Sequence, residues 1–296
     1  MRSSMVHAEV KNAILSARQS PRQNHLLAAL PAADYEHLLP HLELVPLPLG
    51  WSVYEAGAAQ EYVFFATTGI VCKRCVMEDG SSAEIAVVGN EGVVGIALFL
   101  GGESTPSRAV VLSAGYGYRL RASVLKSEFS QGGNLQHLLL RYTQALITQI
   151  AQTAVCNRYH ALEQRLCRLL LLSRDRLPFN ELAITQKLIA NMLGVRREGV
   201  TEAAGKLQAA GLIHYSRGRI TVLNRPKLEA QVCECYAVVK REYDRLLPEV
   251  RAPSARHRSA DSYPTADLIR PQIPPLRTAA AKVSYEDFNA TNALRP

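Results

Sequence analysis

The sequence predicts an α+β protein with an N-terminal double-stranded β-helix, or jelly roll, then a long helix and a C-terminal winged helix-turn-helix. Three observations predict this order. Short β-prone segments punctuated by glycine fill residues 44–125. Residues 134–172 contain neither Gly nor Pro, which favours long helix. Residues 184–224 alternate helical and hairpin patterns around Gly194 and Gly218.

The chain of 296 residues is long enough for two domains. The parts that we expect are a flexible arm (1–24), a β-roll (25–131), a long helix (132–157), a winged helix-turn-helix domain (158–231), a C-terminal helix (232–248) and a disordered Pro-rich tail (249–296).

Composition and charge narrow the class of protein. No stretch approaches the roughly 18 apolar residues of a membrane span, and residues 1–20 hold no signal-peptide core, so we expect a cytoplasmic protein without a membrane partner. Six scattered cysteines do not form a disulfide scaffold. The net charge is −5 over residues 25–131 and +6 over residues 158–250. The basic half suits contact with phosphate, although solvated surfaces also carry such an excess.

The β-prone segments of the N-terminal half are short and separated by turns, and a short helix is expected near His25. The strands predicted from them are Trp51–Tyr54, Tyr62–Ala66, Ile70–Cys72, Glu84–Val88, Ala109–Leu112 and Tyr116–Leu120. Their number and even spacing favour an antiparallel roll.

The long helix carries a stripe of residues spaced alternately by four and three positions. The stripe consists of Leu135, Leu139, Tyr142, Leu146, Gln149, Thr153 and Cys156. This is the spacing of a coiled-coil seam, so we expect the helix to join two copies of the chain. The alternative is that the stripe packs only on the chain's own β-roll.

The best-defined motif begins at Ile184. Thr185 is placed to cap a short helix, and Gly194 can adopt the positive φ of a tight turn into a second helix. The order of apolar residues around this turn is that of a helix-turn-helix. After Gly211 a hairpin turns through Arg217 and Arg219, in the layout of a wing whose arginines face a phosphate backbone or simply water.

The second helix of the motif exposes side chains that can read bases. Arg197 can donate two hydrogen bonds to guanine, and Glu198 can accept one from cytosine. The alternative for these two residues is a surface ion pair.

These segments together resemble the Crp/Fnr superfamily of bacterial transcription regulators. The resemblance covers residues 26–248: residues 161–176 are similar to the helix after the family's dimer helix, 184–224 to its winged helix-turn-helix, and 89–95 to the turn of its cyclic-nucleotide-binding-type β-roll. It implies a homodimer that binds an inverted-repeat operator in double-stranded DNA, with the β-roll as sensor and RNA polymerase as a further partner.

The resemblance also implies roles for single residues. Base readout falls to Arg197, Glu198, Thr201 and Glu202, and phosphate contact to Thr185, Lys187, Arg196, Arg217 and Arg219. Glu202 departs from the arginine that many members carry at its position, which predicts a different operator.

The effector pocket of the family maps onto Gly95, Ser107 and Arg108. Ile96 stands where cyclic-nucleotide binders have an acid, and Ser107 and Arg108 are reversed in order. A one-residue displacement turns a strand side chain to the opposite face, so we expect an effector other than cyclic AMP unless a register shift restores Arg108.

Metal and catalytic sites are not predicted. Cys72 and Cys75, on one strand, point to opposite faces, and Cys233 with Cys235 on a helix is poorly aligned for one metal. No cofactor is expected, and no Ser/His/Asp set, P-loop or His-x-His pair suggests an enzyme. A dimeric scaffold without DNA binding remains the alternative, against which the arginines at 196 and 197 argue.

Overall fold

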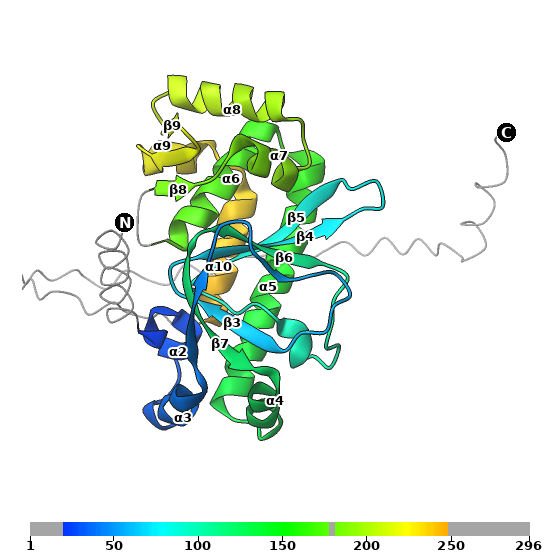
Figure 1. Cartoon of the computed structure of the whole chain (residues 1–296). Helices are drawn as coiled ribbons and strands as arrows, with labels where there is room; N and C mark the ends of the chain where they lie inside the picture. Colours follow the sequence, from blue (N-terminus) through cyan, green and yellow to red (C-terminus); the bar gives the residue numbers. More distant parts are fainter. Residues whose placement is uncertain (1–19, 178–180, 248–296) are drawn as a thin grey trace, which may run out of the picture. The chain divides into compact units, whose positions relative to one another are not determined.

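A computed structural model describes residues 20–177 and 181–247, which belong to one compact unit. The arm predicted over residues 1–24 lies outside the described residues up to residue 19, and the predicted tail 249–296 lies outside them entirely. The architecture is α+β, as predicted: strands fill the first half, a long helix follows, and short helices with a small sheet end the described chain (Figure 1).

The N-terminal half is an antiparallel β-roll of two sheets. One sheet has the order β1-β7-β3 and the other β2-β6-β4-β5. Their bounds are β1 Glu43–Leu47, β2 Ser52–Tyr54, β3 Tyr62–Ala66, β4 Ile70–Val76, β5 Ser82–Val88, β6 Arg108–Ser113 and β7 Gly115–Arg121. Each predicted strand lies within or overlaps one of these. Apolar side chains from both sheets are buried between them, as in other double-sheet rolls.

Short helices precede the roll: η1 (Pro21–Gln23), α2 (His25–Ala28), α3 (Ala32–Leu38) and η2 (Leu39–His41). The buried side chain of Asn24 caps α2 by accepting hydrogen bonds from the backbone N–H groups of Leu26 and Leu27. Its amide nitrogen donates to the carbonyl oxygens of Ala66 and Gly92, at 2.9 and 2.8 Å. The part of the predicted arm from residue 20 to 24 therefore belongs to the folded roll.

Three helices connect the two halves of the chain: α4 (Ala122–Ser130), α5 (Asn134–Tyr159) and α6 (Leu162–Asp175). The segment without Gly or Pro is helical as predicted, but it breaks at His160, whose backbone is extended, with φ −107° and ψ 145°. The break lets α6 turn away from α5 and begin the C-terminal half.

The C-terminal half contains a helix-turn-helix and a three-stranded sheet of order β8-β10-β9. The elements are β8 Glu181–Ala183, α7 Gln186–Leu193, α8 Arg197–Ala209, β9 Ile213–Ser216, β10 Arg219–Val222, α9 Arg225–Gln231 and α10 Glu234–Leu246. The predicted hairpin is the β9–β10 pair, and the predicted final helix is α10.

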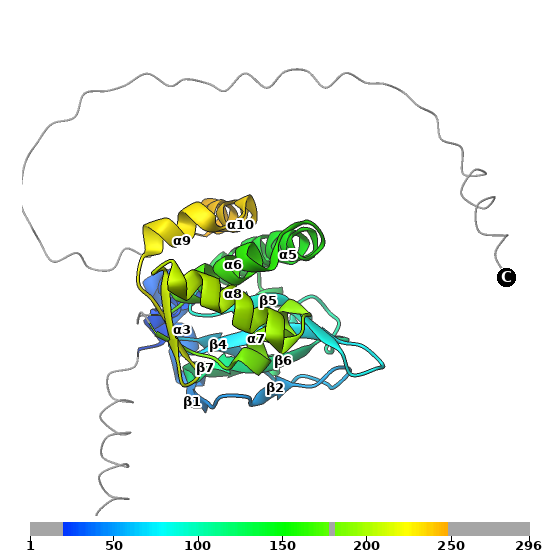
Figure 2. The ribbon, with the colours of Figure 1, turned by 90° about the horizontal axis from the view of Figure 1, so that it is seen from above.

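Helix α5 is covered on two sides within the same chain. It packs against β5 of the roll and against α10, and α7 also reaches β5. Figure 2 shows this stacking, with α10 outside α5 and the strands beneath it. The two halves are thus in direct contact.

This packing corrects the residues predicted for the dimer seam. All seven are buried within the single chain, namely Leu135, Leu139, Tyr142, Leu146, Gln149, Thr153 and Cys156. They pack inside the chain, as the alternative expectation held, because the side of α5 that they occupy faces β5 and the other helices. The outward side of α5 instead carries Leu140, Ile147 and Val155, which are 44%, 59% and 44% exposed.

None of the helices in residues 20–177 and 181–247 is long and apolar enough to cross a lipid bilayer.

Candidate functional site

The helix-turn-helix begins with a capped helix, α7. The Thr185 hydroxyl accepts a hydrogen bond from the Leu188 backbone N–H at 3.2 Å, which satisfies one of the free donors of the first turn. Ile189, Met192 and Leu193 are buried on one face of this helix. Thr185 and Lys187 themselves are exposed, so this helix start is open to a ligand.

Gly194 makes the turn between α7 and α8. Its φ of 62° and ψ of 41° are left-handed, a conformation that glycine adopts without strain. The N–H groups of Gly194 and Val195 both bond to the Ala190 carbonyl, which closes the turn. Arg196 then precedes α8 with extended backbone, and no side chain in the described part of the chain caps this helix start. The free N–H groups and the helix dipole there favour an anion.

The first two turns of α8 expose Arg197, Glu198, Thr201 and Glu202, as predicted for a recognition helix. Gln186, which the sequence analysis did not single out, holds two of them. Its Oε1 accepts hydrogen bonds from Arg197 Nε at 3.3 Å and from Thr201 Oγ1 at 3.1 Å. Gln186, the first residue of α7, therefore orients the side chain of Arg197, the first residue of α8.

Unlike the other predicted base readers, Glu202 forms an ion pair within α8. Its Oε1 pairs with Lys206 Nζ at 2.8 Å, one turn further along α8, and Lys206 also pairs with Glu163 of α6 at 2.7 Å. These contacts draw the Glu202 carboxylate toward its own helix. Among the residues predicted to read bases, Arg197, Glu198 and Thr201 stay grouped near the α8 start.

The wing is a two-residue hairpin with an arginine at its tip. Arg217 and Gly218 both have positive φ, 49° and 76°, the pattern of a type I′ turn. This turn directs Arg217 into solvent, whereas Arg219 forms an ion pair with Glu181 of β8. Of the two wing arginines predicted to touch phosphate, Arg219 already has a carboxylate partner.

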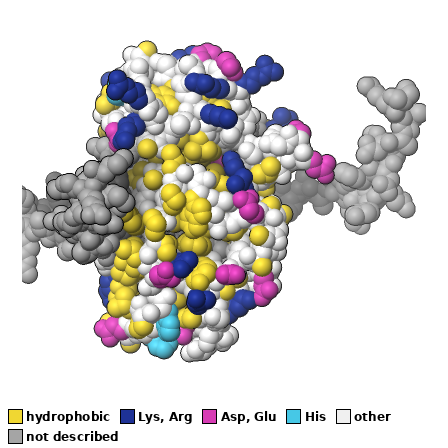
Figure 3. Space-filling model, in the orientation of Figure 1, with side chains coloured by type: hydrophobic (Ala, Val, Ile, Leu, Met, Phe, Trp, Pro, Cys, Tyr) yellow, Lys and Arg dark blue, Asp and Glu magenta, His cyan; other side chains and the backbone are white. Residues whose placement is uncertain are grey.

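The starts of α7 and α8 and the wing tip enclose a hollow of about 410 Å³. Its lining consists of Thr185, Gln186, Arg197, Tyr215, Arg217 and Gly218. Tyr215 is a further residue that the sequence analysis missed; its hydroxyl donates to the Ile184 carbonyl at 3.2 Å. Figure 3 shows Lys and Arg side chains gathered at the end of the molecule that holds α8. Two arginines around a concave surface make this hollow suitable for a phosphate backbone.

A buried network links the C-terminal half to the roll. Arg176 at the end of α6 donates from Nε to Glu91 Oε1 at 2.6 Å and from Nη2 to Gln149 Oε1 at 2.8 Å. Gln149 Nε2 in turn donates to the Val87 carbonyl at 2.9 Å. Gln149, which dilutes the apolar stripe in the sequence, is therefore the residue through which α5 connects β5 to α6.

The glycines of the 89–95 turn fit against this network. A Cβ on Gly89 would lie 2.6 Å from Arg176 Cβ, and one on Gly92 would lie 2.4 Å from the Tyr142 ring. Larger residues would separate the roll from α5 and α6. The motif that resembles a nucleotide-binding turn thus serves here as a packing surface.

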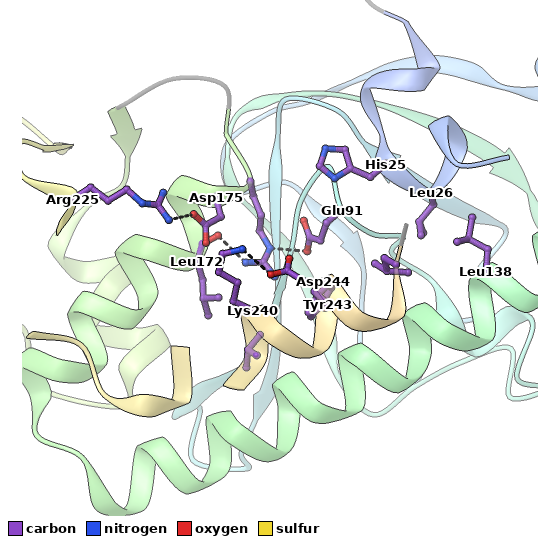
Figure 4. A pocket seen from close by; sticks show the side chains of 13 residues that line it. His25, Leu26, Glu91, Leu138, Leu172, Asp175, Arg225, Lys240, Tyr243 and Asp244 are labelled. Atoms are coloured by element: carbon purple, nitrogen blue, oxygen red, sulfur yellow. Dashed lines mark hydrogen bonds and ion pairs between the residues drawn. The ribbon is translucent and has the colours of Figure 1, made fainter. Parts of the chain in front are cut away.

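A cavity of about 510 Å³ lies next to the network, between the end of α6, the roll and α10. Figure 4 shows Glu91, Asp175 and Tyr243 lining it from these three parts, and Asp175 pairs with Arg225 at 2.7 Å. Its walls come from both halves of the chain, and it is separate from the predicted effector pocket.

The three residues predicted for the effector pocket do not line one cavity. Arg108 Nε pairs with Glu55 at 2.9 Å, and the buried Ser107 hydroxyl shares a hydrogen bond with that of Thr105 at 3.0 Å. Gly95 only begins the short helix η3 (Ile96–Leu98). The register therefore does not bring Arg108 into a pocket.

A neighbouring cavity of about 260 Å³ lies in the roll beside Ile96 and Pro106. Its polar lining includes Lys73 and Gln60, which are 7% and 8% exposed. Neither polar atom of the Gln60 amide has a hydrogen-bond partner within the described residues, and no carboxylate among them pairs with Lys73. Burial lowers the pKa of Lys73, partly opposed by Cys75. Lys73 and Gln60 were not identified from the sequence.

Comparison with known proteins agrees with this architecture. Residues 164–231 match the Crp-like helix-turn-helix domain. FixK2 from Bradyrhizobium japonicum is 19% identical, with a TM-score of 0.57 over 65% of this chain and 98% of that one. The CRP-family regulator TTHB099 from Thermus thermophilus is 18% identical, with a TM-score of 0.53 over 63% and 95%. The c-di-GMP-responsive regulator CLP from Xanthomonas campestris is 16% identical, with a TM-score of 0.53 over 66% and 100%. No curated protein matches the sequence.

Proposed function

We propose that the chain is a DNA-binding transcription regulator of the Crp/Fnr type that binds an inverted-repeat operator as a homodimer. Residues 164–231 match the Crp-like helix-turn-helix domain, and the fold is similar to that of FixK2, which together support this proposal. The observation that carries the proposal is the hollow bounded by Thr185, Arg197 and Arg217. It offers a helix start and a wing tip to phosphate on either side of a base-reading arginine.

Arg197 is the principal base reader in this proposal. It stands at the first position of α8, and its hydrogen bond to Gln186 holds the guanidinium near the side of the helix that enters the major groove. Because Thr201 shares the same acceptor, the two side chains form one unit. Glu198 lies beside them and can accept from cytosine.

The homodimer uses the outward side of α5. Leu140, Gln144, Ile147, Ala151 and Ala154 are exposed there and follow steps of four and three residues, the seam spacing that two parallel helices need. Burial of three large apolar side chains, those of Leu140, Ile147 and Val155, favours a second copy of α5 as the occupant. Two copies related by a twofold axis present two α8 helices, which predicts half-sites about one helical turn apart.

The effector of the proposed sensor is a small anion bound in the roll. The cavity beside Ile96 offers a buried cation, Lys73, and an amide, Gln60, whose donors and acceptors are unused. A negatively charged group would pair with Lys73 and accept a hydrogen bond from Gln60 Nε2, and a hydroxyl on the same ligand could donate to Gln60 Oε1. The pairing of Arg108 with Glu55 argues against cyclic AMP bound in the manner that the family resemblance implies. The proposal also includes action in the cytoplasm, which DNA binding would require, and RNA polymerase as a further partner.

The experiment that tests the proposal is selection of bound DNA from a random pool by the full-length protein and by Arg197→Ala. We expect the wild type to enrich an inverted repeat, and the variant to lose about 1–3 kcal/mol on that sequence with a flattened preference at one position of each half-site. Arg241→Ala, on the exposed side of α10, is the matched control and should select the same repeat. Enrichment of nothing by the wild type would contradict the proposal and favour a scaffold.

A further inference from the structure

Four metal-ligating side chains meet where α5 ends and α10 begins. Cys156 and His160 lie one turn apart at the end of α5, and Cys233 and Cys235 lie at the start of α10. Their sulfur atoms and a ring nitrogen all lie within 4.8 Å of one another, and the three cysteines are almost completely buried. Within the described residues this is the group whose geometry suits a metal ion.

Two of the separations between ligand atoms match the edges of a tetrahedral site, and the remaining ones are at most 4.8 Å. Cys156 Sγ lies 3.6 Å from Cys233 Sγ, and Cys235 Sγ lies 3.6 Å from His160 Nδ1. With Zn–S bonds of about 2.3 Å and a Zn–N bond of about 2.0 Å, a regular tetrahedron has edges of roughly 3.8 Å between sulfurs and roughly 3.5 Å from sulfur to nitrogen. An iron-sulfur cluster would hold its ligands further apart, because sulfide and several iron atoms lie between them.

The surroundings of the four ligands are those of a metal site. His160 Nε2 lies 3.4 Å from a carboxylate oxygen of Glu234, while Nδ1 faces the Cys235 sulfur. Such carboxylate pairing fixes the ring orientation of metal-bound histidines. Three thiolates around a divalent ion leave one negative charge. The buried guanidinium of Arg168 interacts electrostatically with Cys156 and Cys235 and would offset part of this charge.

We propose that Cys156, His160, Cys233 and Cys235 bind one structural Zn²⁺ per chain. Four protein ligands leave no open position, so the ion supplies a cross-link and no catalysis. The cross-link fastens the end of α5 to the start of α10 beside the break at His160, where the long helix passes into the DNA-binding half. A bound ion therefore holds α10 against α5 and stiffens this joint.

This site revises the expectation that no metal is bound. Cys156 was placed in a dimer seam, and Cys233 and Cys235 were expected to diverge on a helix. The structure shows Cys233 before the helix, with extended backbone at φ −71° and ψ 161°, which lets both sulfurs face α5. The four-residue spacing of Cys156 and His160, at the end of the long helix and just past it, was the signal available in the sequence.

The test uses the full-length protein purified under reducing conditions. We expect about one zinc per chain by elemental analysis, and replacement by Co²⁺ should give the visible bands of a tetrahedral thiolate complex. Cys156→Ser and Cys233→Ser should lower zinc affinity at least about tenfold in a competition with a chelator. Cys167→Ser, at an equally buried cysteine outside the group, and Cys75→Ser, at an exposed one, are the matched controls and should retain the metal.

Two further measurements distinguish the loss of a metal ligand from a general folding defect in a variant. His160→Cys preserves four ligands and should still bind Co²⁺, with a spectrum shifted toward all-sulfur coordination. In the wild type, alkylation should reach Cys75 at once but reach Cys156, Cys233 and Cys235 only after the metal is removed. Failure of the reduced wild type to take up either ion would overturn the proposal. So would equal metal loss in Cys167→Ser and Cys156→Ser, or a Cys156–Cys233 disulfide in place of the ion.

Discussion

Arg176 Nε lies 2.6 Å from Glu91 Oε1 in an ion pair that joins the end of α6 to the loop after β5. Both side chains are buried, at 5% and 13% exposure, and Arg176 also bonds to Leu172 and Gln149. Every donor group of this guanidinium therefore faces a partner inside the protein. The C-terminal half is therefore attached to the roll through a buried ion pair. Loss of either partner would leave an uncompensated charge in the interior, which destabilises the fold.

Glu91→Gln should destabilise the protein by about 3–5 kcal/mol, because it leaves the buried Arg176 cation without its counter-charge. Urea unfolding followed by circular dichroism measures this loss. The matched control is Glu43→Gln, which removes the partner of Arg119 from an exposed pair and should cost at most about 1 kcal/mol. Equal losses in the two variants would show that the buried pair contributes no more than a surface pair.

Arg217→Ala should weaken binding to all DNA sequences alike, because the wing tip contacts phosphate in our proposal. The slope of log affinity against log salt should become shallower by about one. Arg219→Ala should have a smaller effect, since Glu181 already neutralises Arg219. Binding measured by fluorescence anisotropy at several salt concentrations compares the two. A loss confined to one base pair would assign Arg217 to base readout instead.

Ile147→Asp should convert the proposed homodimer into a monomer, because it places a charge in the seam formed by the outward side of α5. Light scattering after size exclusion gives the mass of the particle in solution. Met77→Asp is the matched control, since Met77 is a 63% exposed apolar residue between β4 and β5. An unchanged dimer in Ile147→Asp, or a wild-type monomer, would reject this face as the interface.

Stability should fall as pH rises from about 4.5 to 7, because burial raises the pKa of Glu84 to about 7. The guanidinium groups of Arg168, Arg176 and Arg165 oppose this rise only in part. A folded carboxyl with a raised pKa holds its proton in that window while the unfolded carboxyl has lost it, so deprotonation favours unfolding. Below about pH 4.5 the carboxyl of Glu84 is protonated in both states and the free energy of unfolding is not reduced. Above about pH 7 its deprotonation lowers the free energy of unfolding by on the order of 3 kcal/mol.

Glu84→Gln should remove this pH dependence. Urea unfolding at about pH 5 and pH 8 should show the variant more stable than the wild type only at the higher pH. Glu78→Gln changes an exposed carboxyl near the β4–β5 turn and should leave the profile unchanged. A wild-type profile that is flat across the window would contradict the assignment to Glu84.

Local patterns predicted most of the fold. Tyr62–Ala66 is a strand with the bounds expected from its composition, and Gly194 makes the turn that its place in the motif required. Both depend on interactions between near neighbours in the chain, which a sequence displays directly. The predicted face of α7 and the exposure of Arg197 follow from the same helical spacing.

Long-range packing explains the failures. Helix α5 carries apolar residues on two sides, and spacing alone does not tell which side meets a partner. Only the positions of β5 and α10 show that Leu139 and Tyr142 face inward while Ile147 faces out. The same limit applies to Gln186, whose role depends on α8, and to the metal ligands, which α10 brings to α5 from far along the chain.

The wing turn has a consequence for how the protein could change under selection. Arg217 occupies a left-handed conformation that costs a non-glycine residue about 1 kcal/mol, and nothing in the fold of the turn requires an arginine side chain there. Selection for heat resistance alone would replace it with glycine or asparagine. Retention of arginine at this position under such selection would indicate that the DNA affinity it provides matters more to the cell than the stability gained by its replacement.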